Sequence, residues 1–203
     1  MIEPINHPFT VYYCRHGQTD WNKEDRLQGH ADIPLNEHGR KQARAYGRAM
    51  ARMGINWDEM SFYVSPLNRA VETLELLLEQ TDVSGADIVR DERLIELDLG
   101  DWNGRTIREI EQLYPAEWAA RKASPWLAPV PGGESYGEAE PRLRAFAQSL
   151  KGPSLIVGHG GTGRVFRGLL TNGDPAQFLK TGTRQDRIYV LEKGREDARP
   201  SLF

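Results

Sequence analysis

The stretch Phe9-Thr10-Val11-Tyr12-Tyr13-Cys14-Arg15-His16-Gly17 is the part of the sequence that decides the fold. Its first six residues are mostly aromatic or β-branched, which is typical of a strand, and Gly17 permits a turn directly afterwards. The predicted strand therefore ends at Arg15 and His16, two side chains that can bind an anion or attack it.

Further along the chain, predicted strands and helices alternate, which indicates an α/β fold with a layered sheet. Short apolar runs predict strands at 62–64, 88–89, 154–157 and 187–191, of which 187–191 is predicted to be the last. Helical spacing of apolar residues predicts helices at about 37–53, 66–78, 106–114, 141–150 and 164–170. The segment from 115 to 133 is rich in proline and tryptophan and is predicted to be irregular.

Two helix starts follow from local signals. Ser65 is predicted to be an N-cap with Pro66 as the first helical residue, because both residue types are favoured at those positions. A later helix is predicted to begin at about Pro141, since proline inside a helix removes a hydrogen bond and clashes with the preceding turn.

Three strand ends carry polar or glycine-rich sequences, at 15–17, 65–69 and 159–161. Ligands of open α/β sheets bind beyond the carboxyl ends of the strands. We therefore expect these three segments to meet at one edge of the sheet, where they bring two histidines and two arginines together.

The composition indicates one ordinary globular domain over residues 1–203. Hydrophobic residues make up 39% and charged residues 27%, and the formal net charge is −3. Because no basic stripe dominates, we expect neither a nucleic-acid partner nor a membrane surface. Cys14 is the only cysteine, which excludes an intramolecular disulfide, and no targeting segment is evident. These features favour a cytoplasmic protein.

The sequence disfavours two other kinds of site, a dinucleotide-binding loop and a zinc site. Residues 158–163 satisfy the G-x-G-x-x-G spacing of dinucleotide-binding loops, but only 40 residues follow Gly163, too few to complete such a domain. His7, His30 and His38 have no zinc-ligand spacing. We therefore expect no cofactor and no metal.

At this point the sequence resembles the histidine phosphatase superfamily, also called phosphoglycerate mutase-like. Seven blocks occur in the order of that family: 15–22, 26–29, 34–39 with 42–43, 65–70 with Thr73, 94–96 with 100–104, 131–135, and 157–161. The resemblance covers nearly the whole chain, and it implies a three-layer α/β/α sandwich with a mixed, mostly parallel sheet.

By this resemblance His16 is the nucleophile and forms a phosphohistidine. Arg15, Arg69 and His159 hold the phosphoryl oxygens, with Asn22 and Gly160 lining the same pocket, and Glu96 is the general acid. The chemistry agrees, because a neutral imidazole attacks without first losing a proton. Guanidinium groups and a protonated His159 would replace the metal ions that other phosphatases use.

The expected partner is a small-molecule phosphate ester, and a homodimer is left open. The substrate is not identified by the sequence. Residues from about 97 to 133 are predicted to cover the pocket. Six side chains in this segment are candidates for contacting the substrate: Arg105, Arg108, Trp118, Arg121, Lys122 and Trp126. The alternative is that the charged residues form a solvated helix face and the tryptophans pack inward.

The main function expected is therefore hydrolysis of phosphate monoesters. Two alternatives remain: a cofactor-dependent phosphoglycerate mutase, which uses the same residues to transfer the phosphoryl group, and a binding module without activity. The binding module is disfavoured because every expected transfer residue is present.

Overall fold

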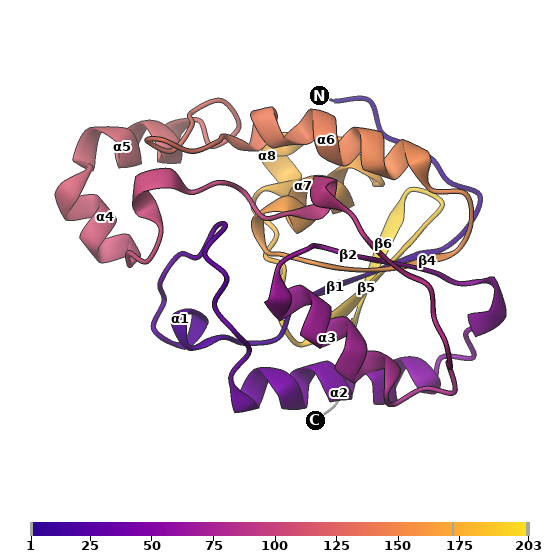
Figure 1. Ribbon diagram of the computed structural model, residues 1–203. Coiled ribbons are helices and arrows are strands. Elements are labelled where there is room, and N and C mark those ends of the chain that lie inside the picture. The colour runs from indigo at the N-terminus through magenta and orange to yellow at the C-terminus, as the bar shows by residue number, and fades with distance from the viewer. Residues whose placement is uncertain (1, 172, 202–203) are drawn as a thin grey trace.

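A mixed sheet of six strands forms the middle of the computed structural model, which describes residues 2–171 and 173–201 (Figure 1). The strands are β1 (Val11–Arg15), β2 (Ser61–Val64), β3 (Ile88–Arg90), β4 (Ser154–Gly158), β5 (Arg187–Glu192) and β6 (Arg195–Pro200), in the spatial order β3-β2-β4-β1-β5-β6. The pairs β3–β2, β2–β4 and β4–β1 are parallel, whereas β5 is antiparallel to both β1 and β6. The predicted mixed, mostly parallel sheet is confirmed.

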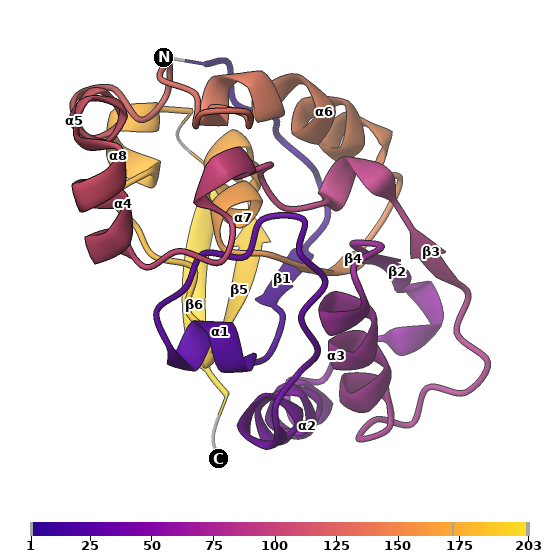
Figure 2. The same ribbon diagram turned by 60° about the vertical axis from the view of Figure 1, so that its left-hand side comes forward.

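Helices cover both faces of the sheet, as Figures 1 and 2 show. On one face lie α2 (Glu37–Ala51) and α3 (Asn68–Leu78), and on the other lie α6 (Tyr136–Ser149), α7 (Gly161–Leu169) and α8 (Pro175–Phe178). The three-layer α/β/α architecture is therefore confirmed. The other elements are α1 (Asp20–Lys23), α4 (Ile107–Leu113), α5 (Pro115–Ala123) and the 3-10 turns Trp57–Glu59, Glu92–Leu94 and Gly100–Trp102.

Side chains that alternate between the two faces of the central strands divide the core into two halves. In β1, Tyr13 packs among side chains of α6 and α7, whereas the next residue, Cys14, packs against α2 and α3. In β4, Ile156 joins the first half and Val157 the second. Successive side chains of a strand point to opposite faces, so a strand covered on both sides is apolar throughout.

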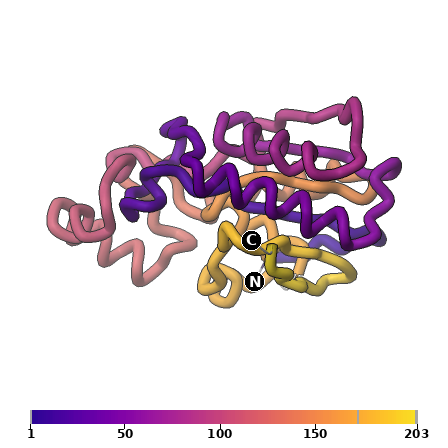
Figure 3. The backbone as a smooth tube through the Cα atoms, turned by 90° about the horizontal axis from the view of Figure 1, so that it is seen from below, coloured from indigo at the N-terminus to yellow at the C-terminus, as the bar shows by residue number. Residues whose placement is uncertain are grey.

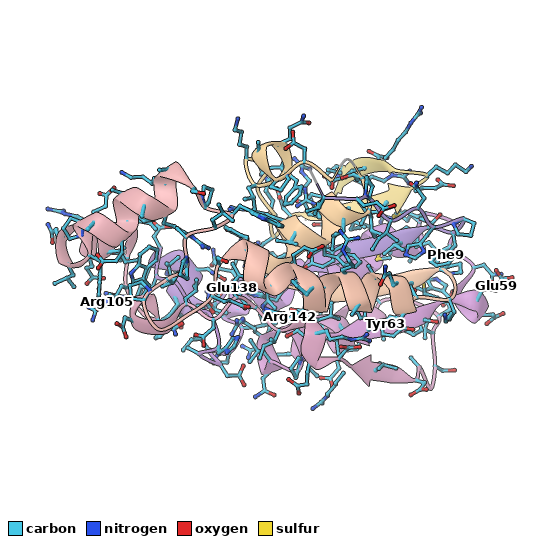
Figure 4. The ribbon with its side chains drawn as sticks, turned by 90° about the horizontal axis from the view of Figure 1, so that it is seen from above. Phe9, Glu59, Tyr63, Arg105, Glu138 and Arg142 are labelled. Carbon is cyan, nitrogen blue, oxygen red and sulfur yellow. The ribbon has the colours of Figure 1, made fainter. Side chains whose placement is uncertain are left out.

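The segment that carries α4 and α5 extends beyond the sheet at one end of the molecule (Figure 3). It has a small core of its own, in which Trp102, Ile110 and Val130 are buried and Trp118 packs against them. The rings of Trp102 and Trp118 meet edge to face with centroids 5.7 Å apart. Figure 4 shows Arg105 in this extension and Arg142 on α6, over the body of the fold.

The helix predicted to start at about Pro141 begins five residues earlier, at Tyr136. Ser135 accepts a hydrogen bond from the Glu138 amide, and the Glu138 carboxylate accepts one from the Ser135 amide, which is a complete capping box. Pro141 lies inside the helix at an exposed position. The prediction was wrong because it weighed the proline and overlooked the S-x-x-E signal before it.

The prediction also missed α5 and β6 and misplaced the start of α7. Residues 115–123, predicted to be irregular, form α5 with Pro115 at the N-terminus, where proline is tolerated. Strand β6 follows the strand that was predicted to be last; all of its residues are exposed, so it has no apolar alternation to reveal it. Helix α7 begins at Gly161 instead of Arg164. Among the described residues, no helix combines the length and apolar character needed to span a membrane.

Candidate active site

Parallel pairing of β1 with β4 brings the two predicted histidines together. Arg15 is opposite Gly158 in the register, and the His16 amide donates to the Gly158 carbonyl at 2.9 Å. The next residue on each strand is a histidine, and the His16 and His159 ring centroids are 5.2 Å apart. Both side chains are buried, with 2% and 0% of their surface exposed.

The hydrogen bonds of His16 leave one ring nitrogen available. Its Nδ1 lies 2.7 Å from the carbonyl oxygen of Gly17, an acceptor, so Nδ1 carries the proton and Nε2 carries a lone pair. Burial, followed by the charges of Arg69 and Arg15, holds the pKa of His16 well below its usual range. The ring is therefore neutral at pH 7, the form needed for nucleophilic attack.

Gly17 is required here for a steric reason. A Cβ atom added at this position would lie 2.3 Å from the Gly39 carbonyl oxygen, at the start of α2. The close approach lets the loop after β1 turn sharply and fixes the Gly17 carbonyl that orients His16.

Arg15 and Arg69 place two buried guanidinium groups at the same end of the sheet. Arg69 donates to the carbonyls of Gly29 and Ala31 at 2.7 and 2.6 Å, and Arg15 donates to the Thr183 carbonyl at 3.1 Å. Burial lowers the pKa of Arg69 to about 10, which leaves it charged. The Nε atoms of both arginines are buried and have no hydrogen-bond partner within the described residues. Buried donors of this kind favour binding of an anion.

His159 is the second histidine of the site. Burial and the neighbouring charges of Arg69 and Arg15 hold the pKa of His159 well below its usual range, so its imidazole is neutral in this structure. Its Nε2 lies 2.6 Å from the hydroxyl of Ser65. The prediction of a protonated His159 concerns the site with phosphate bound; without phosphate, burial and the two arginines favour the neutral ring.

Ser65 is a site residue that was assigned another role. The prediction placed it at the N-cap, with Pro66 as the first helical residue, but α3 begins at Asn68. Asp32 performs the capping from a distant loop, since its carboxylate accepts from the Asn68 amide at 2.9 Å. Ser65 is thereby free to hold the His159 ring, a contact between residues 94 positions apart that local sequence signals do not indicate.

The Glu96 carboxylate lies at the N-terminus of α7. It accepts hydrogen bonds from the amides of Gly160, Gly161 and Thr162 at 2.9–3.0 Å, and from the Leu97 amide at 3.0 Å. Burial opposes ionisation, but these amides, together with the charge of Arg15, give Glu96 a lowered pKa. The capping of α7 by Glu96 explains why the helix starts at Gly161.

Arg142 on α6 holds the segment that carries Glu96 (Figure 4). Its guanidinium donates to the carbonyls of Arg93 and Ile95 at 2.8 and 2.7 Å and pairs with the Glu134 carboxylate at 2.6 Å. These hydrogen bonds satisfy backbone carbonyl groups in a segment that belongs to no strand. They thereby fix the position from which Glu96 reaches α7.

Asn22 is held by a residue that the sequence did not single out. The Oδ1 atom of Asn22 accepts from the Thr19 amide at 3.2 Å and from Gln185 Nε2 at 2.9 Å. Gln185 Nε2 is also 3.1 Å from the His16 carbonyl. With Oδ1 occupied, the NH₂ group of Asn22 is the part that remains available as a donor. No local motif signals Gln185, because its partners lie more than 160 positions earlier.

A cavity of about 460 Å³ lies at this end of the sheet. Of the predicted site residues, the cavity is lined by Arg15, His16, Asn22, Arg69, Glu96 and Gly160. His159 is packed beside His16 and is absent from the lining. Of the six candidates between residues 97 and 133, Trp118, Arg121 and Lys122 line the cavity, whereas Arg105, Arg108 and Trp126 do not.

The glycine-rich loop after β4 does not have the geometry of a dinucleotide site. In such sites the helix N-terminus offers free amides to a pyrophosphate. Here the amides of Gly160, Gly161 and Thr162 are bound by Glu96. Gly161 is needed for this contact, because a Cβ atom there would lie 2.9 Å from Glu96 Oε1.

Comparisons with known proteins agree with this geometry. Phosphoserine phosphatase 1 of Hydrogenobacter thermophilus is 29% identical over 137 residues, which are 68% of this chain and 62% of that protein. A 2,3-bisphosphoglycerate-dependent phosphoglycerate mutase of Rhizobium meliloti is 31% identical over 182 residues, covering 84% of this chain and 83% of that protein. A mycobacterial glucosyl-3-phosphoglycerate phosphatase structure superimposes with a TM-score of 0.80 at 28% identity, covering 96% of this chain and 100% of that one.

The sequence model of the histidine phosphatase superfamily (branch 1) matches residues 11–202. The matched region contains both strand-end histidines and the carboxylate that caps α7. The chain belongs to the histidine phosphatase superfamily.

Proposed function

We propose that the protein hydrolyses phosphate monoesters of small metabolites through a phosphohistidine at His16. The observation that carries the proposal is the state of His16: its ring is neutral, Nδ1 is bound to the Gly17 carbonyl, and the ring lines the cavity beside two arginines with unpaired Nε atoms. The relatives that are phosphatases of phosphoserine and of glucosyl-3-phosphoglycerate support the same reading.

In the first step, the lone pair of His16 Nε2 attacks phosphorus and the bond between phosphorus and the ester oxygen breaks. The electron pair of that bond leaves with the alcohol oxygen, which takes a proton from Glu96. Arg15 and Arg69 bind the equatorial phosphoryl oxygens, where negative charge is spread during transfer. The Nδ1–H bond to Gly17 stabilises the positive charge that the ring acquires.

In the second step, a water molecule attacks the phosphohistidine, loses a proton to the Glu96 carboxylate and releases inorganic phosphate. Together, the two steps return Glu96 and His16 to their starting protonation states. The lowered pKa of Glu96 suits the second step, where a carboxylate is needed. A bound phosphate dianion brings negative charge next to Glu96, which raises its pKa and favours the acid form for the first step.

We further propose that this hydrolysis needs no metal ion. The supporting feature is the pair of guanidinium groups of Arg15 and Arg69, which line the cavity and supply positive charge where the phosphoryl oxygens bind. Within residues 2–171 and 173–201, no group of three or more histidine, cysteine, aspartate or glutamate side chains has a metal-binding arrangement.

The mutase is the second candidate, since one relative with 31% identity is a phosphoglycerate mutase. A mutase must retain a second phosphate, and this favours extra cations close to the acid. Here Leu97 and Leu99 line the cavity next to Glu96, and the Asp98 carboxylate accepts from the Gly100 amide. Apolar side chains at these positions leave a second phosphate without partners, which favours hydrolysis.

We therefore expect net release of inorganic phosphate from a panel of monoesters, with a chelator present, and little conversion between 2- and 3-phosphoglycerate even with the 2,3-bisphosphate. Phosphate release and isomerisation are measured in the same reaction. Fast isomerisation that depends on the bisphosphate, with negligible phosphate release, would contradict hydrolysis in favour of the mutase. Loss of activity with the chelator, restored by one divalent ion, would contradict the metal-free proposal.

The low pKa of Glu96 gives a prediction with a definite sign. Glu96 is mostly ionised at neutral pH, so the rate constant kcat/KM for alkyl phosphates is expected to rise as pH falls from 8 to 5. His16 stays neutral over most of this range because its own pKa is lowered. For aryl phosphates the rise is expected to be smaller, since an aryl leaving group needs little protonation.

The control is Glu96→Gln, for which we expect a loss of about 10²–10⁴-fold on alkyl phosphates, a smaller loss on aryl phosphates, and no difference in pH slope between the two. Thermal unfolding of the variant checks that α7 is still folded. Equal losses on both substrate types, with the difference in slope retained, would show that Glu96 is not the acid.

Gln185 is expected to act as a positioning residue for Asn22. Replacing Gln185 by Ala removes one of the two donors to Asn22 Oδ1 and leaves only the Thr19 amide, so the side-chain amide of Asn22 is held less firmly with its NH₂ group towards the phosphate. We expect kcat/KM to fall about 10-fold, the worth of one charge-assisted hydrogen bond. In the Asn22→Ala background the same change is expected to have little further effect. Lys180→Ala is the surface control. Additive losses in this double-mutant cycle would show that Gln185 does not act through Asn22.

A further inference from the structure

The cavity holds more positive charge than a phosphate monoester needs. Its lining contains one carboxylate, Glu96, among the described residues, and six cationic side chains: Arg15, Arg26, Arg69, Arg121, Lys122 and Arg164. Arg15 and Arg69 match the two charges of a phosphate dianion. Arg26 and Lys122 form ion pairs with glutamates of α4. After the charge of the Glu96 carboxylate is subtracted, one positive charge remains, and Arg121 and Arg164 are the side chains that supply it.

Arg164 has an unoccupied hydrogen-bonding edge. Its Nη1 donates to the hydroxyl of Tyr136 at 3.1 Å, whereas its Nε is buried and has no partner in the part of the chain that the structure describes. The side of the guanidinium that carries Nε and Nη2 therefore has an unsatisfied donor at Nε. Two parallel N–H bonds on such an edge match the two oxygens of a carboxylate.

The place of Arg164 on α7 sets its distance from the transferred phosphoryl group. Arg164 follows Gly160 by four residues, so the two lie on one face of the helix, about 6 Å apart along its axis. Gly160 is next to Arg15, because a Cβ atom at Gly160 would lie 3.2 Å from Arg15 Cζ. Arg164 is thus about one helical turn beyond the phosphate-binding arginine.

A second buried cation adjoins this edge. The guanidinium of Arg121 lies over the Tyr136 ring, 4.6 Å from its centroid, and donates to the Ala128 carbonyl. Only 7% of Arg121 is exposed, and burial lowers its pKa. Its hydrogen-bond and ring partners are neutral, while the charges of Glu138 and Glu134 act to raise its pKa. An anion nearby stabilises a buried cation further. The cavity wall also contains apolar side chains, including Leu27, Leu99 and Ile107.

We propose that Arg164, oriented by Tyr136, binds a carboxylate on the alcohol part of the substrate. The substrates are then phosphate monoesters of hydroxy acids, with the carboxylate two or three bonds from the ester oxygen. Arg164 is a specificity residue in this scheme, and it takes no part in bond breaking. The inference rests on the proposed phosphatase function, because the phosphoryl group fixes the position from which the carboxylate reaches Arg164.

The test compares two esters that differ at one group, 3-phosphoglycerate with a carboxylate and glycerol 3-phosphate with a hydroxymethyl group. We expect the wild-type protein to favour the acid in kcat/KM by at least about 10-fold. Arg164→Gln is expected to lower this preference by about 10- to 100-fold, the range for hydrogen bonds to charged groups. Tyr136→Phe is expected to lower it by less. Arg48→Gln, which removes one exposed arginine from α2, is expected to leave the preference unchanged.

Release of phosphate from 4-nitrophenyl phosphate distinguishes failure of the carboxylate site from failure of the proposed phosphatase function. A wild-type protein that hydrolyses this aryl ester but shows no preference for the acid, or a preference that survives in Arg164→Gln, would overturn the carboxylate site and leave the phosphatase in place. A wild-type protein that hydrolyses no ester would overturn both. If thermal unfolding shows that Arg164→Gln is not folded, Arg164→Lys and Tyr136→Phe decide, and wild-type preference in both would overturn the site.

Discussion

The parallel pairing of β1 with β4 is the constraint on which the site depends. It aligns Arg15 with Gly158, so that the residue after each strand is a histidine and both histidines lie at one edge of the sheet. Because β2 pairs with β4 on its other side, Ser65 follows the neighbouring strand and reaches His159. A shift of one residue in the β1–β4 register would point the apolar side chains of β1 at the wrong layers and separate the two histidines.

The electrostatics of the site depend on one carboxylate among several cations. Glu96 satisfies the first amides of α7, and those amides lower its pKa, so the helix and the acid–base group stabilise each other. Burial, followed by the charges of the arginines, lowers the pKa of His16 and keeps the ring neutral and thus nucleophilic. Burial of these cations opposes folding in the absence of an anion, so binding of a phosphate ester is expected to stabilise the folded protein.

Much of the fold and the site could be predicted from the sequence, because each signal was local or periodic. Alternation and apolar runs identified the central strands, and the strand-end position of His16 followed from the residues around it. Local signals failed where distant groups decide the outcome. The cap of α3 comes from Asp32, so Ser65 is used elsewhere, and the charged edge strand β6 has no apolar pattern.

The same reasoning explains which features of the site the sequence did not indicate. The protonation of His159 depends on its burial with Arg15 and Arg69, and a sequence does not measure burial. Gln185 contributes through contacts with His16 and Asn22 that cross most of the chain. In contrast, the start of α6 was within reach of the sequence, since Ser135 and Glu138 have the spacing of a capping box.

The location of the phosphoryl group during turnover decides whether His16 is the nucleophile. The protein is mixed rapidly with a phosphate monoester and quenched in alkaline denaturant, because phosphohistidine hydrolyses in acid. Its peptides are then mapped by mass spectrometry. We expect a phosphoryl group on the imidazole of His16 and none on protein with His16→Ala. A phosphoryl group on another residue, or one retained by folded protein with His16→Ala, would contradict this role of His16.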